Sequence, residues 1–331
     1  MKTGSFVSIG ATSAAALLVA GSAFAAEVTV TAITSLVQQN PLSKSFVANF
    51  VGPVNAACKG QFQVKYLGGP ENSPPRNAYK AVQRGQFDVL HGPTSYYIGA
   101  FPEAYGMLAS NVPVSELHKN GGYAMLDKLY QTKVGAKLVA WGEKETGYYT
   151  YLMKKPKVGS DGLPDLSGMK MRASGTYRPL FQKLGASTVN MKESEIYTGL
   201  QRGVVQGFGW PVTGVPALGL HKIAKYFVTP SFYKTNTTVT MNLAKWNSLS
   251  KAQKDCIDKV ARPYENTSVV FMEKERIADE KSMRSGGMQP FELKGDAAKK
   301  YLTVAYDAIW AEFEKRSKDS SGLKAKLYRP E

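Results

Sequence analysis

The sequence predicts an α/β protein whose mostly parallel sheets are covered by helices, and three observations carry this prediction. Segments typical of strands alternate with segments typical of helices, which is the pattern of parallel sheets. This alternation occurs twice, before and after a polar connection at residues 154–168. After the second series, residues 250–284 contain no helix breaker except Pro263, so they predict one long helix, kinked if the proline bends it.

The first series begins with residues 28–33, an alternating β-branched segment that predicts a buried strand. Phe46, Phe50 and Val54 recur at helical spacing and predict a helix over residues 38–58. The rest of this half is expected to contain strands at residues 61–67, 87–90, 137–141 and 147–153, with helices at 76–84 and near 115–130.

The second series follows the polar connection and repeats the same alternation. Ligands of α/β proteins bind beyond the carboxyl ends of strands, so the loops after strands 87–91, 169–173 and 204–210 are the places expected to hold a site. The further elements expected here are helices at 176–184, 193–202 and 296–317, a strand running between domains at 235–243, and a last strand at 288–293.

The N-terminus predicts an export signal over residues 1–25. Lys2 supplies a positive charge, residues 7–24 are apolar, and Ala23-Phe24-Ala25 has the small-x-small pattern of a cleavage site. The alternative is a membrane anchor, but the apolar stretch is short and rich in small residues for a span of about 20 residues. We therefore expect a periplasmic chain that begins at Ala26 and is not itself embedded in the membrane.

The two cysteines and the strong positive charge limit which redox state and which binding partners are expected. Cys58 and Cys256 could form a disulfide in an oxidising compartment or stay as two buried thiols, and the sequence leaves both open. The net charge of +16 raises nucleic acid as a partner, but the lysines and arginines are scattered and form no run of five. We therefore expect small anions, and no nucleic acid, as partners.

Motifs of catalysis and of cofactor binding are missing. The three histidines, His91, His118 and His221, have no metal-binding spacing, and no CxxC, HExxH, GxSxG or phosphate-binding loop occurs. Gly207-Phe208-Gly209 begins like a dinucleotide fingerprint, but Val212 stands where the third glycine belongs. We expect no cofactor and no metal, and His91 with Ser95 is the one candidate pair for an enzyme.

One long segment carries a family resemblance. It reads DLSGMKMR at residues 165–172, LGA at 184–186 and SEIYTGLQRGVV at 194–205. This resembles the solute-binding subunits of TRAP (tripartite ATP-independent periplasmic) transporters, the DctP family, whose usual pattern is DLKGLKIRV followed by LGA and SEVYTALQTGVVDGQENP. The order of the expected elements matches that family over nearly the whole chain after the signal.

The resemblance implies a two-lobed fold like that of periplasmic binding proteins, with inter-lobe strands and a long connecting helix. It divides the chain into lobe I, residues 26–143 plus 236–270, and lobe II, residues 144–235 plus 271–331, with the helix at about 250–284 spanning both. It also implies that Arg172, at the end of a short strand, grips the carboxylate of a ligand. A guanidinium suits this role because its planar fork matches a carboxylate.

Departures from the family pattern shape the expected ligand. Tyr149 stands where some members carry a second arginine, Trp210 stands where asparagine is usual, and Gly209 replaces a glutamate that helps one branch hold a cation. We therefore expect no metal and a cleft rich in rings, unless these rings prove to be core residues. The remaining candidates for ligand binding are Phe208, Tyr96, Tyr97, Tyr148, Tyr233, Glu71, Thr94, Ser95 and Asn236, the last four of which could instead serve local turn chemistry.

The expected function is that of a periplasmic solute-binding protein of a TRAP transporter. It would capture a small organic anion, such as a monocarboxylate with an apolar or aromatic body, and deliver it to the membrane permease without making or breaking bonds. Two alternatives remain open from the sequence: a ligand-sensing subunit for a receptor kinase, and a periplasmic enzyme acting on organic acids.

Overall fold

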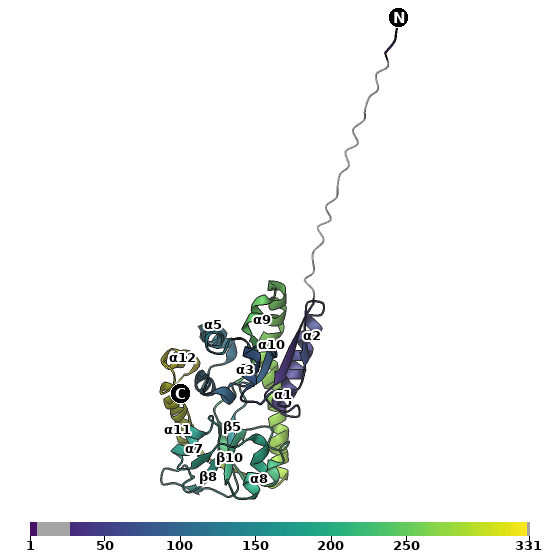
Figure 1. Ribbon diagram of the computed structural model, residues 1–331. Helices are drawn as coiled ribbons and strands as arrows, with labels where there is room; N and C mark the ends of the chain where they lie inside the picture. Colours follow the sequence, from purple (N-terminus) through teal and green to yellow (C-terminus); the bar gives the residue numbers. More distant parts are fainter. Residues whose placement is uncertain (5–26, 330–331) are drawn as a thin grey trace.

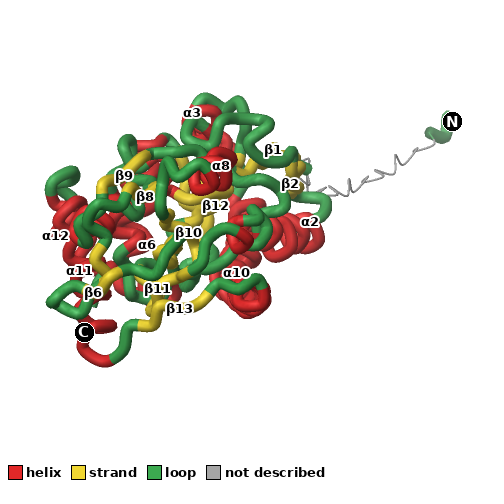
Figure 2. The backbone as a smooth tube through the Cα atoms, turned by 90° about the horizontal axis from the view of Figure 1, so that it is seen from below, coloured by secondary structure: helices red, strands yellow, loops and turns green. Residues whose placement is uncertain are grey.

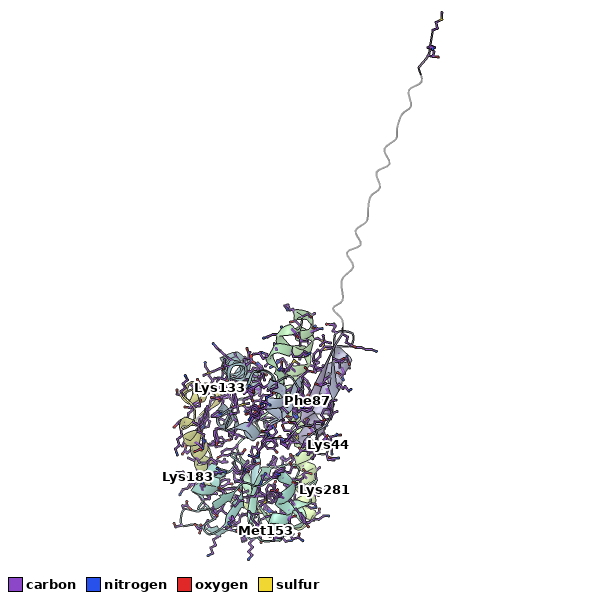
Figure 3. The ribbon with its side chains drawn as sticks, viewed as in Figure 1. Lys44, Phe87, Lys133, Met153, Lys183 and Lys281 are labelled. Carbon is purple, nitrogen blue, oxygen red and sulfur yellow. A yellow bond between two sulfur atoms is a disulfide. The ribbon has the colours of Figure 1, made fainter. Side chains whose placement is uncertain are left out.

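The computed structural model describes residues 1–4 and 27–329, so the expected signal peptide lies almost wholly outside the described residues. The chain from residue 27 onward forms two β-sheets, each with its own helices, which lie one above the other in Figure 1. In Figure 3, Phe87 and Lys133 belong to the half built on the first sheet, whereas Met153 and Lys183 belong to the half built on the second. The α/β, two-lobed prediction is therefore confirmed.

The first sheet has five strands, and four of them run in the same direction. β1 (Val28–Thr34) pairs in parallel with β2 (Phe62–Tyr66) and with β3 (Val89–Pro93). β12 (Thr237–Asn242) lies between β3 and β4 (Ala136–Trp141) and is antiparallel to both. This strand was expected to run between domains, but it is fully buried inside the first sheet.

The second sheet has six strands in the order β13-β11-β5-β10-β8-β9 and again contains one reversed strand. β5 (Tyr148–Leu152) is antiparallel to both of its neighbours, β10 (Gly207–Pro211) and β11 (Tyr226–Phe232). β5 arrives directly from the first sheet, so no crossover helix turns it into the parallel direction. The other strands are β8 (Lys170–Arg172), β9 (Ser187–Val189) and β13 (Gln289–Glu292).

Two strands of the second sheet escaped the sequence pattern for local reasons. β11 contains Pro230, which cannot donate to a ladder and therefore weakens a strand signal. The structure accommodates the proline at a register shift between Val228 and Phe232. β9 has only three residues, too few for any alternation to be recognised. The expected polar connection also contains a short hairpin, β6 (Lys157–Val158) with β7 (Pro164–Asp165).

The helices of the first half are shorter than the sequence suggests. The single helix expected at residues 38–58 is observed as α1 (Pro41–Phe46), a π-helical turn over Val47–Val51, and α2 (Gly52–Ala57). Pro53 lacks an amide hydrogen, so the regular ladder cannot continue through this point. The remaining helices here are α3 (Ala78–Gln83), α4 (Glu103–Leu108), α5 (Val114–Asn120), α6 (Gly122–Leu129) and α9 (Leu243–Ser248).

Helices also flank the second sheet. α7 (Arg178–Lys183) lies between β8 and β9 in the chain, and α8 (Ile196–Gln201) between β9 and β10. α11 (Gly295–Glu314) packs against α7 and β11. Figure 2 shows α10 and α11 on opposite sides of the strands of this sheet. α12 (Ser320–Leu327) contacts α4, α5 and α6, so the last helix returns to the first half.

Besides the link from α11 to α12, three described segments join the two halves. β4 leads into β5 through residues 142–147, and β11 leads back into β12 through residues 233–236. The third is α10 (Lys251–Ser285), an unbroken helix of 35 residues that passes through Pro263. It contacts α1, α2 and β4 of the first half and the turn at Leu220–Lys222 of the second (Figure 1).

We keep the division into lobe I, residues 26–143 plus 236–270, and lobe II, residues 144–235 plus 271–331, as a proposal. Supporting it, every strand of the first sheet falls within the residues of lobe I, and every strand of the second sheet within those of lobe II. The exception is α12, which lies in lobe II by number and packs on lobe I.

A disulfide closes the first half. Cys58 and Cys256 are bonded with an S–S distance of 2.04 Å, so the chain has the bonded state of the two that the sequence allowed. The bridge fastens the end of α2 to α10 beside an apolar cluster that contains Phe50 and Ile257. Within the described residues, no helix combines the length and the apolar character needed to cross a membrane.

Candidate functional site

A cavity of about 550 Å³ lies between the two sheets. It is lined at the carboxyl ends of strands, because Ser95 follows β3, Arg172 ends β8 and Trp210 lies at the end of β10. The loops that the sequence pointed to therefore meet at one place. Side chains of both halves contribute, since Thr237 of β12 and Tyr148 of β5 also line the cavity.

Arg172 is the central charge of this cavity. Its side chain is 5% exposed, and its guanidinium lies over the ring of Trp210, 5.3 Å from the ring centre. Nε donates to the carbonyl of Met191 and Nη1 to the carbonyl of Gly209, each at 3.2 Å. Burial lowers the pKa of Arg172, but a guanidinium remains protonated at neutral pH.

The positive charge of Arg172 has no counter-charge bonded to it. Both of its hydrogen-bond acceptors are neutral carbonyls, and within the described chain no carboxylate lies at ion-pair distance. A buried charge is costly unless it is paired. The cavity therefore favours an anionic group bound against this guanidinium.

Aromatic rings form much of the remaining wall. Tyr96, Tyr148, Tyr177 and Trp210 all line the cavity. The rings of Tyr148 and Tyr177 meet edge to face, with centroids 5.4 Å apart. Burial raises the pKa values of Tyr148 and Tyr177, so their phenols stay neutral and can donate hydrogen bonds to a ligand. Such a wall suits a flat or apolar body.

The structure brings five of the twelve expected ligand-binding residues to the cavity, namely Arg172, Trp210, Tyr148, Ser95 and Tyr96. The other seven do not line it: Tyr149, Phe208, Tyr97, Tyr233, Asn236, Thr94 and Glu71.

Strand geometry explains the placement of Tyr149 and Phe208. β5 and β10 are antiparallel, with Tyr148 opposite Pro211 at the cavity end. Tyr149 lies opposite Trp210, but its hydroxyl is held by α10, where it donates to Glu280 Oε1 at 2.8 Å. Phe208 shares the face of Trp210 but lies two residues deeper, stacked on Tyr151. Tyr148 and Trp210 lie on opposite faces of the sheet and both line the cavity, so closeness to this strand end and the packing of each side chain, rather than the face alone, decide which residues reach it.

Local roles account for Glu71 and Tyr233. Glu71 is exposed, and its Oε1 accepts from the amide of Gly69 at 2.7 Å, which lowers the pKa of the carboxyl. This is the turn chemistry that the sequence allowed as the alternative. Tyr233 is buried in the second crossing between the halves, and its hydroxyl donates to the carbonyl of Ala305 at 2.8 Å.

Asn236 lies behind the cavity wall. Its Oδ1 accepts from the amide of Ser95 at 3.4 Å, and its Nδ2 donates to the carbonyl of Ala104 at 3.1 Å. Asn236 therefore orients the segment that carries Ser95 and Tyr96, which was not evident from its sequence position.

The candidate catalytic pair is not assembled. His91 is fully buried, stacks on Phe46 with ring centres 4.5 Å apart, and has Nε2 3.4 Å from Glu143 Oε2. It does not line the cavity, whereas Ser95 does. Among the described residues, no group of three or more histidine, cysteine, aspartate or glutamate side chains is placed to hold a metal ion.

Sequence reasoning missed several cavity residues, most of them polar or charged. Arg76 and Glu193 line the cavity from segments that were read only as helix starts. Tyr177 and Thr237 line it from positions just after β8 and at the start of β12. The sequence places all four next to strand ends or helix starts, where cavity residues are expected. It does not distinguish them from the adjacent residues, which occupy the same kind of position.

Two halves joined by crossing segments, with a cavity between them that holds a buried arginine without a carboxylate partner, are typical of solute-binding proteins. The family comparison agrees: the profile of DctP, described as bacterial extracellular solute-binding protein, family 7, matches residues 34–316. The chain belongs to this family, and the resemblance to the solute-binding subunits of TRAP transporters is thereby confirmed.

Individual relatives give the same result. The chain is 28% identical over 213 residues to a monocarboxylate 2-oxoacid-binding periplasmic protein of Nostoc sp. (strain PCC 7120), covering 58% of this chain and 54% of that protein. A solute-binding protein of Roseobacter denitrificans is 27% identical over 151 residues, covering 44% of this chain and 45% of the relative. The chain thus spans about half the length of these two relatives.

A solved structure of similar fold is DctP7 of Bordetella pertussis, an extracytoplasmic solute receptor binding pyroglutamic acid. It has a TM-score of 0.78 at 16% identity, and the match covers 91% of this chain and 100% of DctP7. A TRAP solute-binding protein of Bordetella bronchiseptica, with calcium and picolinate in its site, has a TM-score of 0.77 at 19% identity and covers 92% of each chain. These likenesses establish the fold.

Proposed function

We propose that this chain is the periplasmic solute-binding protein of a TRAP transporter and that it captures a small organic anion for delivery to a membrane permease. The observation that carries the proposal is Arg172, a buried guanidinium that lines the cavity with no carboxylate paired to it. A ligand carboxylate supplies the missing charge and can accept two parallel hydrogen bonds from the guanidinium fork.

The proposed ligand is a monocarboxylate with an apolar or aromatic body. Tyr96, Tyr148, Tyr177 and Trp210 support this, because their rings surround the place where the body of the ligand would lie. The cavity of about 550 Å³ is of the size that encloses small metabolites. The relatives that bind a 2-oxoacid, pyroglutamic acid and picolinate are consistent with a single carboxylate on a compact body.

The proposed mechanism contains no bond-making step. Ser95 and Thr237 contribute to the cavity from the first half, and Arg172 and Tyr148 from the second. A ligand that contacts both halves favours whichever arrangement brings them together, so binding and closure are coupled. The segments at residues 142–147 and 233–236 are the places where such a hinge motion would be absorbed. No cofactor or metal takes part in this mechanism.

Ligand binding by the chain without residues 1–25 tests the proposal. The protein, stripped of carried-over ligand, is screened by thermal shift against dicarboxylates, keto acids, sugar acids and aromatic acids, since a ligand raises the unfolding temperature by mass action. We expect a clear upward shift with monocarboxylates, aromatic acids among them. A flat response to the whole panel would contradict the proposal.

Arg172→Ala provides the sharper test. Loss of the partner of a buried carboxylate should weaken binding of the best acid by about 2–5 kcal/mol, measured by titration calorimetry. Arg178→Ala is the matched control, because it removes the same charge from an exposed position at the start of α7. Equal affinities of Arg172→Ala and the parent protein would exclude Arg172 as the carboxylate-binding group.

A further inference from the structure

The cavity wall contains charged groups that the proposed carboxylate site does not use, namely Arg76, Lys192 and Glu193. Glu193 lies in a 3-10 turn, Glu193–Glu195, just before α8. Among the described residues that line the cavity, it is the one carboxylate. Its neighbours Lys192 and Ser194 line the cavity as well, so this turn forms a continuous part of the wall.

One carboxylate oxygen of Glu193, Oε1, accepts no hydrogen bond in the described structure. This atom is also shut off from solvent. Burial raises the pKa of Glu193, whereas the charge of Arg172 acts in the opposite direction. A buried acceptor without a partner lowers the free energy of unfolding. The position of Glu193 in the cavity wall is therefore not explained by the stability of the folded chain.

Tyr96 shows that the two charges face the same part of the cavity. Burial raises the pKa of its phenol, the nearby charge of Glu193 raises this pKa further, and the charges of Arg172 and Arg76 lower it. A ligand bound at Arg172 beside the ring of Tyr96 therefore also lies close to Glu193. The carboxylate of Glu193 attracts a donor or a cation on such a ligand and repels a second carboxylate.

We propose that Glu193 is a second ligand-binding group and that it selects carboxylates bearing a hydrogen-bond donor, a hydroxyl or an ammonium group, over dicarboxylates. This inference rests on the proposed function, because it assigns the ligand carboxylate to Arg172. It narrows the ligand class to hydroxy and amino acids with a compact apolar or aromatic body.

Acids that share one skeleton isolate the effect of the donor. The first series is 3-phenylpropanoate, 3-phenyllactate, phenylalanine and benzylmalonate, and the second is butanoate, 2-hydroxybutanoate, 2-aminobutanoate and ethylmalonate. In calorimetric titrations, a hydroxyl- or ammonium-bearing acid should bind about 10- to 100-fold more tightly than the plain acid of its series. The malonates should bind more weakly than the plain acids.

Glu193→Met removes the acceptor at similar side-chain length and should abolish the advantage of the donor-bearing acids. Glu193→Gln keeps the shape and should reduce the advantage of the ammonium more than that of the hydroxyl. Glu195→Gln is the matched control, because it removes the same charge two residues away at an exposed position outside the cavity lining. Without ligand, Glu193→Met should unfold at the same or a higher temperature, because it removes an unpartnered buried acceptor.

The outcomes separate this inference from the proposed function. Plain and donor-bearing acids that bind equally well, or a Glu193→Met variant that keeps the affinity for the best acid of the whole panel, would overturn the role of Glu193 and leave the carboxylate site intact. Failure of every acid to bind the parent protein would instead contradict the proposed function and this inference together.

Discussion

Lys144 is a buried ammonium group in the first crossing between the two halves. Its Nζ donates to the carbonyl of Ser110 at 3.0 Å and lies 3.7 Å from Glu145 Oε1. Burial lowers the pKa of Lys144 to about 8, although the charge of Glu145 opposes the shift, and Lys234 lowers the pKa further. The protonated form is thus held at a cost in the folded state.

The pH dependence of stability follows from that cost. Above pH 8 the folded protein loses the Lys144 proton, while the unfolded chain keeps it up to the ordinary pKa of 10.5, so stability from this group rises between these values. Lys144→Met removes the contribution, and its stability relative to the parent protein should fall from pH 7 to pH 10 by on the order of 1–3 kcal/mol.

Urea unfolding of both proteins at the two pH values measures this difference. Lys119→Met, a change at an exposed position, is the control and should give a gap that does not vary with pH. A pH-independent gap for Lys144→Met would show that the ammonium carries no burial penalty.

At the scale of elements, β5 separates ligand binding from stability within two adjacent residues. Tyr148 lines the cavity, and Tyr149 binds Glu280 of α10 on the opposite face. Tyr148→Ala should weaken the best acid at least about tenfold, because a ring is lost from the wall. Tyr149→Phe should leave affinity unchanged and lower the free energy of unfolding by about 1 kcal/mol.

Calorimetry on the ligand and urea unfolding on the apo protein check the two effects separately. The reverse result, with affinity lost in Tyr149→Phe and kept in Tyr148→Ala, would mean that the strand presents its other face to the ligand.

The two crossing segments share an unusual backbone. Among the described residues, Glu143 and Tyr233 are the non-glycine positions with positive φ, at 52° and 51°, and each lies in one crossing. Buried side chains hold Glu143 in place, since its Oε1 accepts from Ser45 and from Tyr264, each at 2.7 Å. Left-handed conformations persist where the surroundings over-determine them, as at hinges. This supports the assignment of the hinge to these two segments.

At the scale of the whole molecule, the disulfide is the one covalent tie between distant parts of the chain. Cys58 and Cys256 are 198 positions apart, and neither lines the cavity. Cys58→Ala combined with Cys256→Ala should lower the free energy of unfolding by about 2–5 kcal/mol, because the unfolded chain regains the freedom of a long loop. Affinity for the best acid should not change.

Denaturant unfolding of the double variant tests this expectation, with the parent protein under reducing conditions as its counterpart. An unchanged unfolding midpoint in both would show that the bridge adds nothing to the packing of α2 on α10.

The sequence by itself determined the fold class, the order of most elements, the family and the position of Arg172 at the end of a short strand. Period-two and helical spacings are local properties, and the motif around residues 165–205 is long enough to be specific. Elements without a local signature were missed, such as β9 with three residues and β11 with its proline. The single helix expected at residues 38–58 was likewise broken by a π-helical turn.

Only the tertiary structure decided which side chains meet at the site. Adjacent residues of β5 have different neighbours: Tyr148 lies at the strand end beside the cavity, whereas the hydroxyl of Tyr149 is held by Glu280 of α10, so Tyr148 rather than Tyr149 lines the cavity. Glu193 also lines the cavity, because the turn that carries it lies close to Arg172 in space although the two residues belong to separate elements. Such neighbours depend on how separate elements pack together, and a local pattern along the chain carries no record of that packing.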